Sequence, residues 1–124
     1  MIRALSLVLG IELSQGATDV TTVDLVEGDG DTVEPGDTAV FHFVLYRADN
    51  GVALDSTWTT QPIQLPLVDG NFAGLVEGMP GMRVGGRRAI TVPPEKGFGP
   101  DGSPQLGLPA DTDVVVVVDL LGTY

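Results

Sequence analysis

The side chains that most often carry out covalent catalysis are scarce in this sequence. There is no cysteine and His42 is the only histidine, so a Ser-His-Asp arrangement would have to use His42. That residue lies inside the apolar run TAVFHFVLY, where a histidine satisfied by structural hydrogen bonds is the favoured interpretation. The acidic residues are spread over turns and form no localised pair for acid–base work. No group that makes or breaks covalent bonds therefore stands out.

Metal and phosphate sites are not indicated either. Without cysteine, and with a single histidine, thiolate and histidine-rich metal sites are excluded, and we expect neither a metal nor a cofactor. Asp29 and Asp31 faintly resemble a calcium loop, but the spacing of an EF-hand is missing. The glycine-rich segments do not match the phosphate-binding P-loop pattern.

One acidic residue is unusual because of its neighbours. Asp55 lies in VALDSTW, close to aromatic and branched residues beside other turns, and such groups can form an apolar pocket with few polar atoms. A pocket of this kind can catalyse one reaction without a nucleophile, namely rotation about the bond that precedes a proline. The rotation breaks only the amide resonance, with a barrier of roughly 18–20 kcal/mol. A pocket that takes the proline out of water and favours the twisted amide lowers that barrier.

The elements that would position these residues are mainly strands. Strands are expected within residues 19–31, 38–46, 52–58, 63–70, 86–94 and 111–124, separated by turns rich in Gly, Pro and Asp. Apolar residues on both faces predict that 38–46 and 111–124 are central strands. Pro66 predicts an edge position or a bulge for 63–70.

Only one segment, NFAGLVEGM at residues 71–79, is a convincing helix. Asn71 can cap it, and Phe72, Leu75 and Met79 fall on one stripe. The sequence PG at 80–81 ends it, and a long Gly/Pro loop over 95–111 follows the next strand. We therefore predict an α+β fold in which an antiparallel sheet wraps around one short helix.

Composition is consistent with one acidic, folded domain. The chain has 124 residues, 43% of them hydrophobic, and a formal net charge of −11. This charge makes nucleic acid and anionic membrane surfaces poor partners. Solubility is a better explanation of the acidity than an acidic docking face.

The first twenty residues are set apart from the predicted domain, which covers residues 21–124. MIRALSLVLGIEL begins like a signal peptide, but Glu12 interrupts the apolar run and SQGATD is a poor cleavage site. We expect residues 1–20 to form an arm rather than a degenerate export signal. No stretch approaches the ~20 apolar residues of a membrane span. The compartment stays open, with the cytoplasm slightly favoured over export.

Four stretches, in order, resemble the FKBP-type peptidyl-prolyl cis-trans isomerases, or rotamases. VEPGDTAVFHFVLY is similar to the family's Gly-Asp-x-Val-x-Val-His-Tyr strand, and ALDSTW to its Phe-Asp-Ser-Ser segment. FAGLVEGMPGMRVGGRRAITVPPEKGFG is similar to the block in which a helix leads into Met-x-x-Gly-x-Arg, a strand and Pro-x-x-x-x-Tyr-Gly. LPADTDVVVVVDLL is similar to the family's last strand. The resemblance covers about residues 24 to 122 and implies a curved sheet of five or six strands around the helix.

The resemblance also implies which residues form the pocket. Asp55 falls on the family's pocket aspartate, and Phe43 and Phe98 fall on tyrosines. Phe72 falls on the residue whose backbone N–H binds a ligand carbonyl, so these four are the implied catalytic residues. The implied substrate-binding residues are Leu54, Ile63, Leu75, Leu108 and Val116. Without the resemblance, packing in a core would be the favoured role of Ile63, Leu75 and Val116.

The implied pocket is less aromatic than the family pattern. Leu75 replaces a tryptophan at the floor, and Phe98 lacks a hydroxyl that normally helps to hold a bound carbonyl. Each lost contact is worth about 0.5–1.5 kcal/mol, which would reduce activity without abolishing it. Trp58 could add aromatic surface, although an exposed loop position is at least as well supported.

The resemblance implies an isomerase that assists folding by acting on X-Pro bonds in peptides or unfolded proteins, with macrolides such as rapamycin as candidate ligands. The alternative is a catalytically weak FKBP-like binding or chaperone module. A third reading is a secreted β-domain whose sheet binds an extended ligand, but it gives the Gly/Pro block no purpose.

Overall fold

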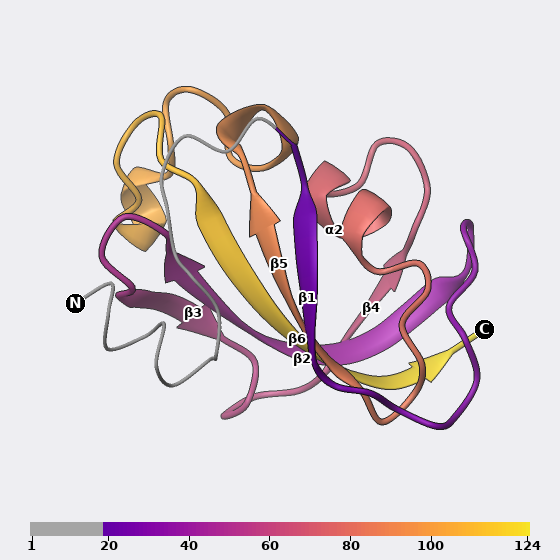
Figure 1. Ribbon diagram of the computed structural model, residues 1–124. Helices are drawn as coiled ribbons and strands as arrows, with labels where there is room; N and C mark the ends of the chain where they lie inside the picture. Colours follow the sequence, from indigo (N-terminus) through magenta and orange to yellow (C-terminus); the bar gives the residue numbers. More distant parts are fainter. Residues whose placement is uncertain (1–18) are drawn as a thin grey trace.

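A computed structural model describes residues 19–124, so the expected N-terminal arm lies outside the described residues apart from Asp19 and Val20. Six strands form one antiparallel sheet (Figure 1). They are β1 (Thr21–Val26), β2 (Thr38–Arg47), β3 (Ala53–Ser56), β4 (Ile63–Pro66), β5 (Arg87–Val92) and β6 (Val114–Thr123). The order is β1-β5-β6-β2-β3, and β4 also pairs with β2. The predicted fold class is confirmed.

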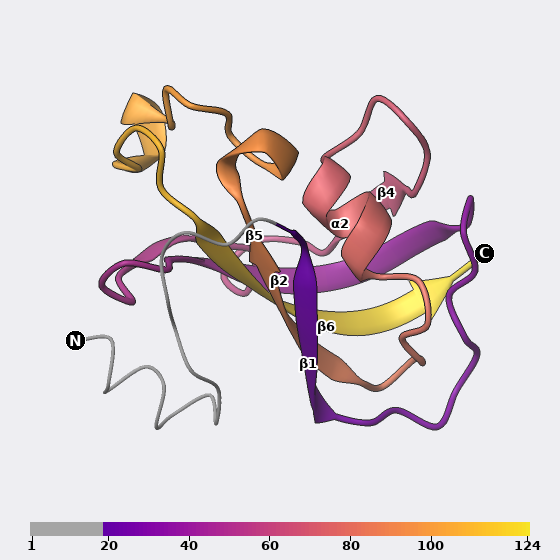
Figure 2. The ribbon, with the colours of Figure 1, turned by 45° about the horizontal axis from the view of Figure 1, so that its top comes forward.

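Residues 19–124 contain one α-helix, α2 (Ala73–Gly78), which lies against one face of the curved sheet. Figure 2 shows this helix and the long β5–β6 connection on the same side of the sheet. That connection contains two short 3-10 helices, η1 (Pro94–Lys96) and η2 (Pro104–Leu106). The concave side of the sheet is therefore the only side that these elements cover.

The two strands predicted to be central do lie inside the sheet. In β2, Ala39, Phe41 and Leu45 are buried toward the helix, and the alternate residues are half-buried on the other face. β6 pairs with β5 on one side and β2 on the other, and Val114 to Val118 are all buried. Val114, Val116 and Val118 belong to the main core, and Val115 and Val117 pack in a second apolar cluster on the other face. A strand buried on both faces needs apolar residues at every position, which explains the run of five valines.

Pro66 ends β4, which pairs with β2 alone among the described strands. This agrees with the edge position that the proline predicted, since proline cannot donate a hydrogen bond to a further strand. β3 and β4 occupy opposite ends of the same side of β2. Asp55 of β3 and Ile63 and Leu65 of β4 line the pocket described below.

Two glycines bring α2 directly onto β5. A Cβ atom on Gly74 would lie 2.5 Å from Cγ2 of Val92, and one on Gly78 would lie 2.6 Å from Cγ2 of Ile90. Both distances are shorter than van der Waals contact, so only glycine permits this spacing. Gly74 and Gly78 thus determine how closely α2 packs on β5.

The start of the helix differs from the prediction. Phe72, not Asn71, is the N-cap residue, and no side chain caps the helix. Asn71 instead donates from Nδ2 to the carbonyl oxygen of Pro66 at 2.6 Å, which ties the helix entry to the end of β4. The tertiary contact has replaced the local capping bond that the residue type favours.

Arg88 links the C-terminal end of α2 to the sheet. Its side chain is buried beneath α2, and Nη1 donates to the carbonyl oxygens of Gly78 at 2.9 Å and Pro80 at 3.2 Å. Its Nε lies 2.6 Å from Oδ1 of Asp24 on β1. One guanidinium therefore satisfies carbonyls at the helix C-terminus and joins them to the edge strand.

Candidate functional site

An apolar pocket of about 260 Å³ opens on the concave side of the sheet. Its walls come from β2, β3, β4 and β6, from the start of α2 and from the β5–β6 connection. The lining residues are Phe43, Leu45, Asp55, Ile63, Leu65, Phe72, Leu75, Phe98, Leu106 and Val116. Nine of these ten side chains are hydrocarbon, so the pocket suits a small apolar group.

The bottom of the pocket is formed by buried residues. Leu75 of α2 and Val116 of β6 are 6% and 2% exposed, yet both line the open space. Neither side chain has moved inward to fill it. The smaller leucine at this position therefore leaves a pocket rather than a collapsed core.

Phe72 and Phe98 form one wall. Their ring centroids lie 5.3 Å apart with planes at 60°, an edge-to-face arrangement that aromatic pairs favour. Phe98 lies just after η1. The next residue, Gly99, has φ 78°, and its N–H donates to the carbonyl oxygen of Pro94 at 2.7 Å. A Cβ on Gly97 would lie 3.4 Å from Cζ of Phe72, so small residues beside Phe98 leave space for the pair. In the segment KGFG, the positive φ of Gly99 and the small size of Gly97 allow the Phe98 ring to line the pocket.

Asp55 is the only charged residue in the lining. It lies on β3 opposite Leu45, is solvent-exposed, and accepts a hydrogen bond from the Ser56 N–H to Oδ1 at 2.8 Å. Within the described part of the chain it has no cationic partner. A carboxylate at the edge of an apolar pocket, with acceptor capacity to spare, can receive a hydrogen bond from a bound ligand.

The backbone of Phe72 offers a donor at the same pocket. Its carbonyl oxygen accepts from the N–H groups of Leu75 and Val76, each at 3.0 Å. Its own N–H donates to no protein acceptor among residues 19–124. A first-turn N–H of this kind is left over by helix geometry and can donate to a ligand.

A lysine near the pocket is already neutralised. Nζ of Lys96, in η1, lies 2.9 Å from Oε2 of Glu77 in α2. The hydrogen bond to Glu77 raises the pKa of Lys96 above its usual value, so the ammonium stays charged and paired at neutral pH. The pair links the β5–β6 connection to the helix.

Seven of the nine residues that the sequence assigned to the site line this pocket. Leu54 and Leu108 do not: Leu54 is half-buried against the core, and Leu108 is buried within it. Leu45 and Leu65 were missed, although each lies two residues after an assigned residue, Phe43 and Ile63, and so on the same face of its strand. Leu106 was also missed, since it ends the short 3-10 helix η2 within the β5–β6 connection, where no strand alternation applies.

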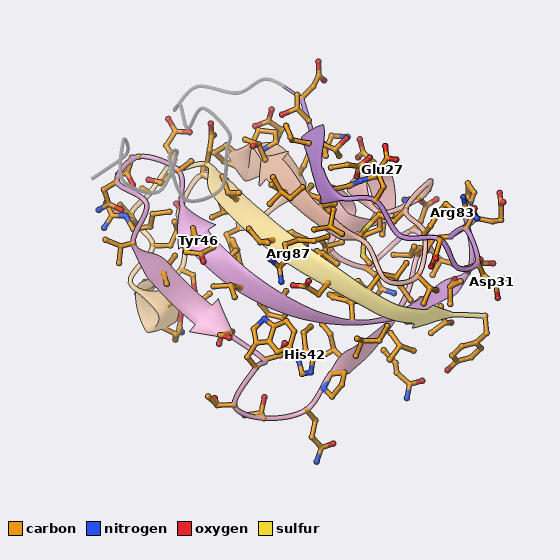
Figure 3. The ribbon with its side chains drawn as sticks, turned by 60° about the horizontal axis from the view of Figure 1, so that its bottom comes forward. Glu27, Asp31, His42, Tyr46, Arg83 and Arg87 are labelled. Atoms are coloured by element: carbon orange, nitrogen blue, oxygen red, sulfur yellow. The ribbon has the colours of Figure 1, made fainter. Side chains whose placement is uncertain are left out.

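His42 and Trp58 lie on the other face of the sheet. His42 Nδ1 is 2.9 Å from Oγ1 of Thr57, and its ring stacks on Trp58 with centroids 4.3 Å apart. Trp58 is 49% exposed and is absent from the pocket lining. Figure 3 shows His42 on the face that α2 does not cover. The histidine is held by structural contacts, as expected, and the tryptophan adds nothing to the pocket.

Two features are absent from residues 19–124. No group of three or more His, Cys, Asp or Glu side chains in this range is arranged to hold a metal ion. No helix in the same range is long and apolar enough to cross a membrane.

Comparison with known proteins decides the family. Residues 30–121 match the profile described as FKBP-type peptidyl-prolyl cis-trans isomerase. The chain belongs to the FKBP-type peptidyl-prolyl cis-trans isomerase family. It is 40% identical over 115 residues to a probable FK506-binding protein of Corynebacterium glutamicum, covering 90% of this chain and 94% of that one. It is 30% identical over 105 residues to an FK506-binding protein of Streptomyces anulatus, covering 83% and 85% of the two chains.

The solved structures agree with this assignment. The N-terminal domain of FKBP42 from Arabidopsis thaliana superposes with a TM-score of 0.78 at 25% identity, covering 91% of this chain and 92% of that domain. The protein is thus a peptidyl-prolyl isomerase that acts on proline-containing chains, and the sequence assignment is confirmed.

Proposed function

We propose that this FKBP-type isomerase binds the proline ring of its substrate in the apolar pocket and catalyses rotation by desolvation and twisted-amide stabilisation. The observation that carries the proposal is an open apolar pocket with one carboxylate at its edge and no nucleophile in its lining. Removing the amide from water favours the less polar, twisted state over the planar, resonance-stabilised one. Binding that twisted state more tightly than the planar one lowers the barrier.

The polar groups at the pocket have separate roles in this proposal. The Phe72 N–H binds a substrate carbonyl and fixes the register of the peptide. Asp55 lies beside the rotating amide, whose proline nitrogen carries no hydrogen to donate, and places a negative charge next to it. Phe43, Phe98 and Val116 hold the proline ring, and Leu75 supports it from below. These roles agree with the placement of all six residues at one pocket.

The competing function is a binding or chaperone module with negligible turnover. A pocket filled by Leu75 and Val116 would have favoured it, but both residues line an open space. The substrates we propose are peptides and unfolded proteins, with assistance to folding as the consequence. Because relatives are named for binding FK506, we also propose macrolide binding at the pocket.

Isomerisation of short peptides with Leu or Phe before proline, with and without rapamycin, tests the proposal. We expect acceleration that rapamycin abolishes and that falls at least about 10-fold in Asp55→Ala, given the usual loss for a positioned polar group. Trp58→Ala is the control, because Trp58 lies outside the pocket. No acceleration over the uncatalysed relaxation of roughly 10–100 s would favour the binding module. Acceleration that survives Asp55→Ala unchanged would remove Asp55 from the mechanism.

A further inference from the structure

Acidic residues surround the pocket. Two segments supply most of its outer wall: residues 53–72 contribute Asp55, Ile63, Leu65 and Phe72, and residues 93–111 contribute Phe98 and Leu106. Together these segments contain five carboxylates and one lysine. The apolar pocket is therefore set in a negatively charged part of the surface.

Four of these carboxylates form no ion pair among the described residues, and we call them the rim acids: Asp55, Asp69, Glu95 and Asp101. All four are exposed. Asp55 itself lines the pocket, and each of the others lies three residues along the chain from Phe72 or Phe98. Since a residue spans at most about 3.3–3.6 Å, each Cα atom is within roughly 11 Å of a lining residue's Cα.

The cations of the described chain are bound mainly to groups other than the rim acids, although Lys96 also attracts its neighbour Glu95. Lys96, the lysine of these segments, is paired with Glu77. The arginines bind elsewhere: Arg47 to Asp49, Arg87 to Asp119, Arg88 to Asp24, and Arg83 to the carbonyl oxygens of Asp29 and Gly30. Figure 3 shows Arg87 on the face of the sheet opposite the helix, away from the pocket.

The rim acids are close enough to act on a bound peptide. Asp55 is at the pocket itself, and the bound of roughly 11 Å for the others is close to the Debye length of roughly 10 Å at 0.1 M salt and well below the roughly 30 Å at 0.01 M salt. When a proline ring occupies the pocket, the residues one or two positions away lie over its edge. Their charges therefore interact with several carboxylates at once, without a fixed contact to any one of them.

We propose that this isomerase prefers prolines flanked within two residues by Lys or Arg, and discriminates against prolines flanked by Asp or Glu. The inference rests on the proposed function, because it assigns a substrate class to the same pocket. Attraction by the rim acids raises the rate of encounter with a cationic segment and slows its release. Acidic segments are repelled on approach, so the discrimination appears in kcat/KM.

The test uses three peptides that are identical, with Leu before proline, except for Lys, Gln or Glu two positions to either side. We expect kcat/KM in the order Lys, Gln, Glu, with at least about a 10-fold difference between Lys and Glu at about 20 mM salt. At about 0.5 M salt the difference should shrink to about 2-fold, because screening removes the long-range interaction. Equal values for the three peptides at low salt would overturn the inference.

Two triple variants locate the effect. Asp69→Asn/Glu95→Gln/Asp101→Asn removes three rim acids and spares Asp55, and it should reduce the Lys-to-Glu ratio to about 3-fold or less. Glu27→Gln/Asp29→Asn/Asp31→Asn changes the net charge equally, but at exposed residues beside β1, and should leave the ratio unchanged. Equal effects of both variants would mean that overall charge, not the rim, discriminates.

The Gln peptide separates this inference from the proposed function. If it is not isomerised at all, the proposed function fails. If it is isomerised and the Lys and Glu peptides match it, only the preference for cationic flanks fails.

Discussion

Phe98 shows how a single atom can set the efficiency of an otherwise complete pocket. Its ring is held edge-to-face against Phe72, so the hydrophobic part of the wall is in place. What the residue lacks, relative to the tyrosine of the family pattern, is a hydroxyl at the end of that ring. A phenylalanine there can pack on a proline but cannot donate to a carbonyl.

We therefore expect Phe98→Tyr to raise kcat/KM for a Leu-Pro peptide by about 2- to 10-fold. This range corresponds to one new hydrogen bond of about 0.5–1.5 kcal/mol in the transition state. The measurement is isomerisation rate against enzyme concentration. Phe98→Leu is the control and should lower the rate, since it removes the ring without adding a donor. A tyrosine variant no faster than wild type would show that the hydroxyl has no partner in this pocket.

At the residue scale, the sequence was informative where alternation or a family motif applied. Seven of the residues assigned from the family motifs line the pocket. For two of them, Phe43 and Ile63, strand periodicity accounts for their place on the concave face. Leu54 packs against the main core but is not in the pocket lining: it falls at an irregularity in the β2–β3 register, between Ala53 and Asp55, where simple alternation does not apply. Leu106 depends on the path of a loop, which no local periodicity encodes.

The contact between α2 and β5 determines where the helix lies, and with it Phe72 and Leu75. That contact has glycine on one side and branched side chains on the other. Gly78 faces Ile90, which is fully buried and cannot move away. The requirement for glycine here is a matter of space, not of backbone conformation.

We expect Gly78→Ala to reduce the free energy of unfolding by about 1–3 kcal/mol, despite the higher helix propensity of alanine, because the added methyl overpacks the contact. Urea denaturation measures this change. Gly122→Ala in β6 is the matched control, since a Cβ there would lie 3.9 Å from Val40 in ordinary contact. A Gly78→Ala protein as stable as wild type would mean that the helix can shift outward at little cost.

Arg88 makes the second link between helix and sheet. Replacing it with Met should cost about 3 kcal/mol in unfolding free energy, because two carbonyl oxygens and the Asp24 carboxylate lose a buried donor. Arg87→Met is the control: its ion pair with Asp119 is on a half-exposed side chain and should be worth less than about 1 kcal/mol. Similar losses for the two variants would contradict a special role for the buried arginine.

Elements were easier to predict than their ends. The strands at 38–46 and 111–124, the helix and the edge strand all follow from apolar periodicity and proline placement. The cap of α2 did not, because Asn71 found a partner in Pro66, a residue of another element. Nor did the role of Arg88 follow, since a charged residue in a strand gives no sign of which carbonyls it reaches.

At the scale of the whole molecule, charge is unbalanced, with 17 acidic residues against 6 basic ones. Four ion pairs use most of the described cations, and the remaining carboxylates repel one another. Compact states suffer from this repulsion more than extended ones. Stability should therefore depend on ionic strength.

We expect the urea midpoint to rise when NaCl is raised from about 20 mM to about 0.5 M, over a range where screening becomes effective. The variant with Glu27, Asp29 and Asp31 neutralised should gain less from salt than wild type does. A midpoint that falls with salt would indicate that the ion pairs outweigh the repulsion.

The position of β6 in the sheet has a consequence for how the protein is made. β6 follows its partners in the chain, yet it lies between β5 and β2. Among the strands of residues 19–124, it alone joins the β1–β5 pair to the β2–β3–β4 group. During synthesis, neither part of the sheet can close on the other until β6 has left the ribosome. Both parts must wait with their apolar faces open, which is the state in which chaperones bind nascent chains. The sheet of this prolyl isomerase is thus completed only by its last strand, through pairings between distant residues, which are slow to form.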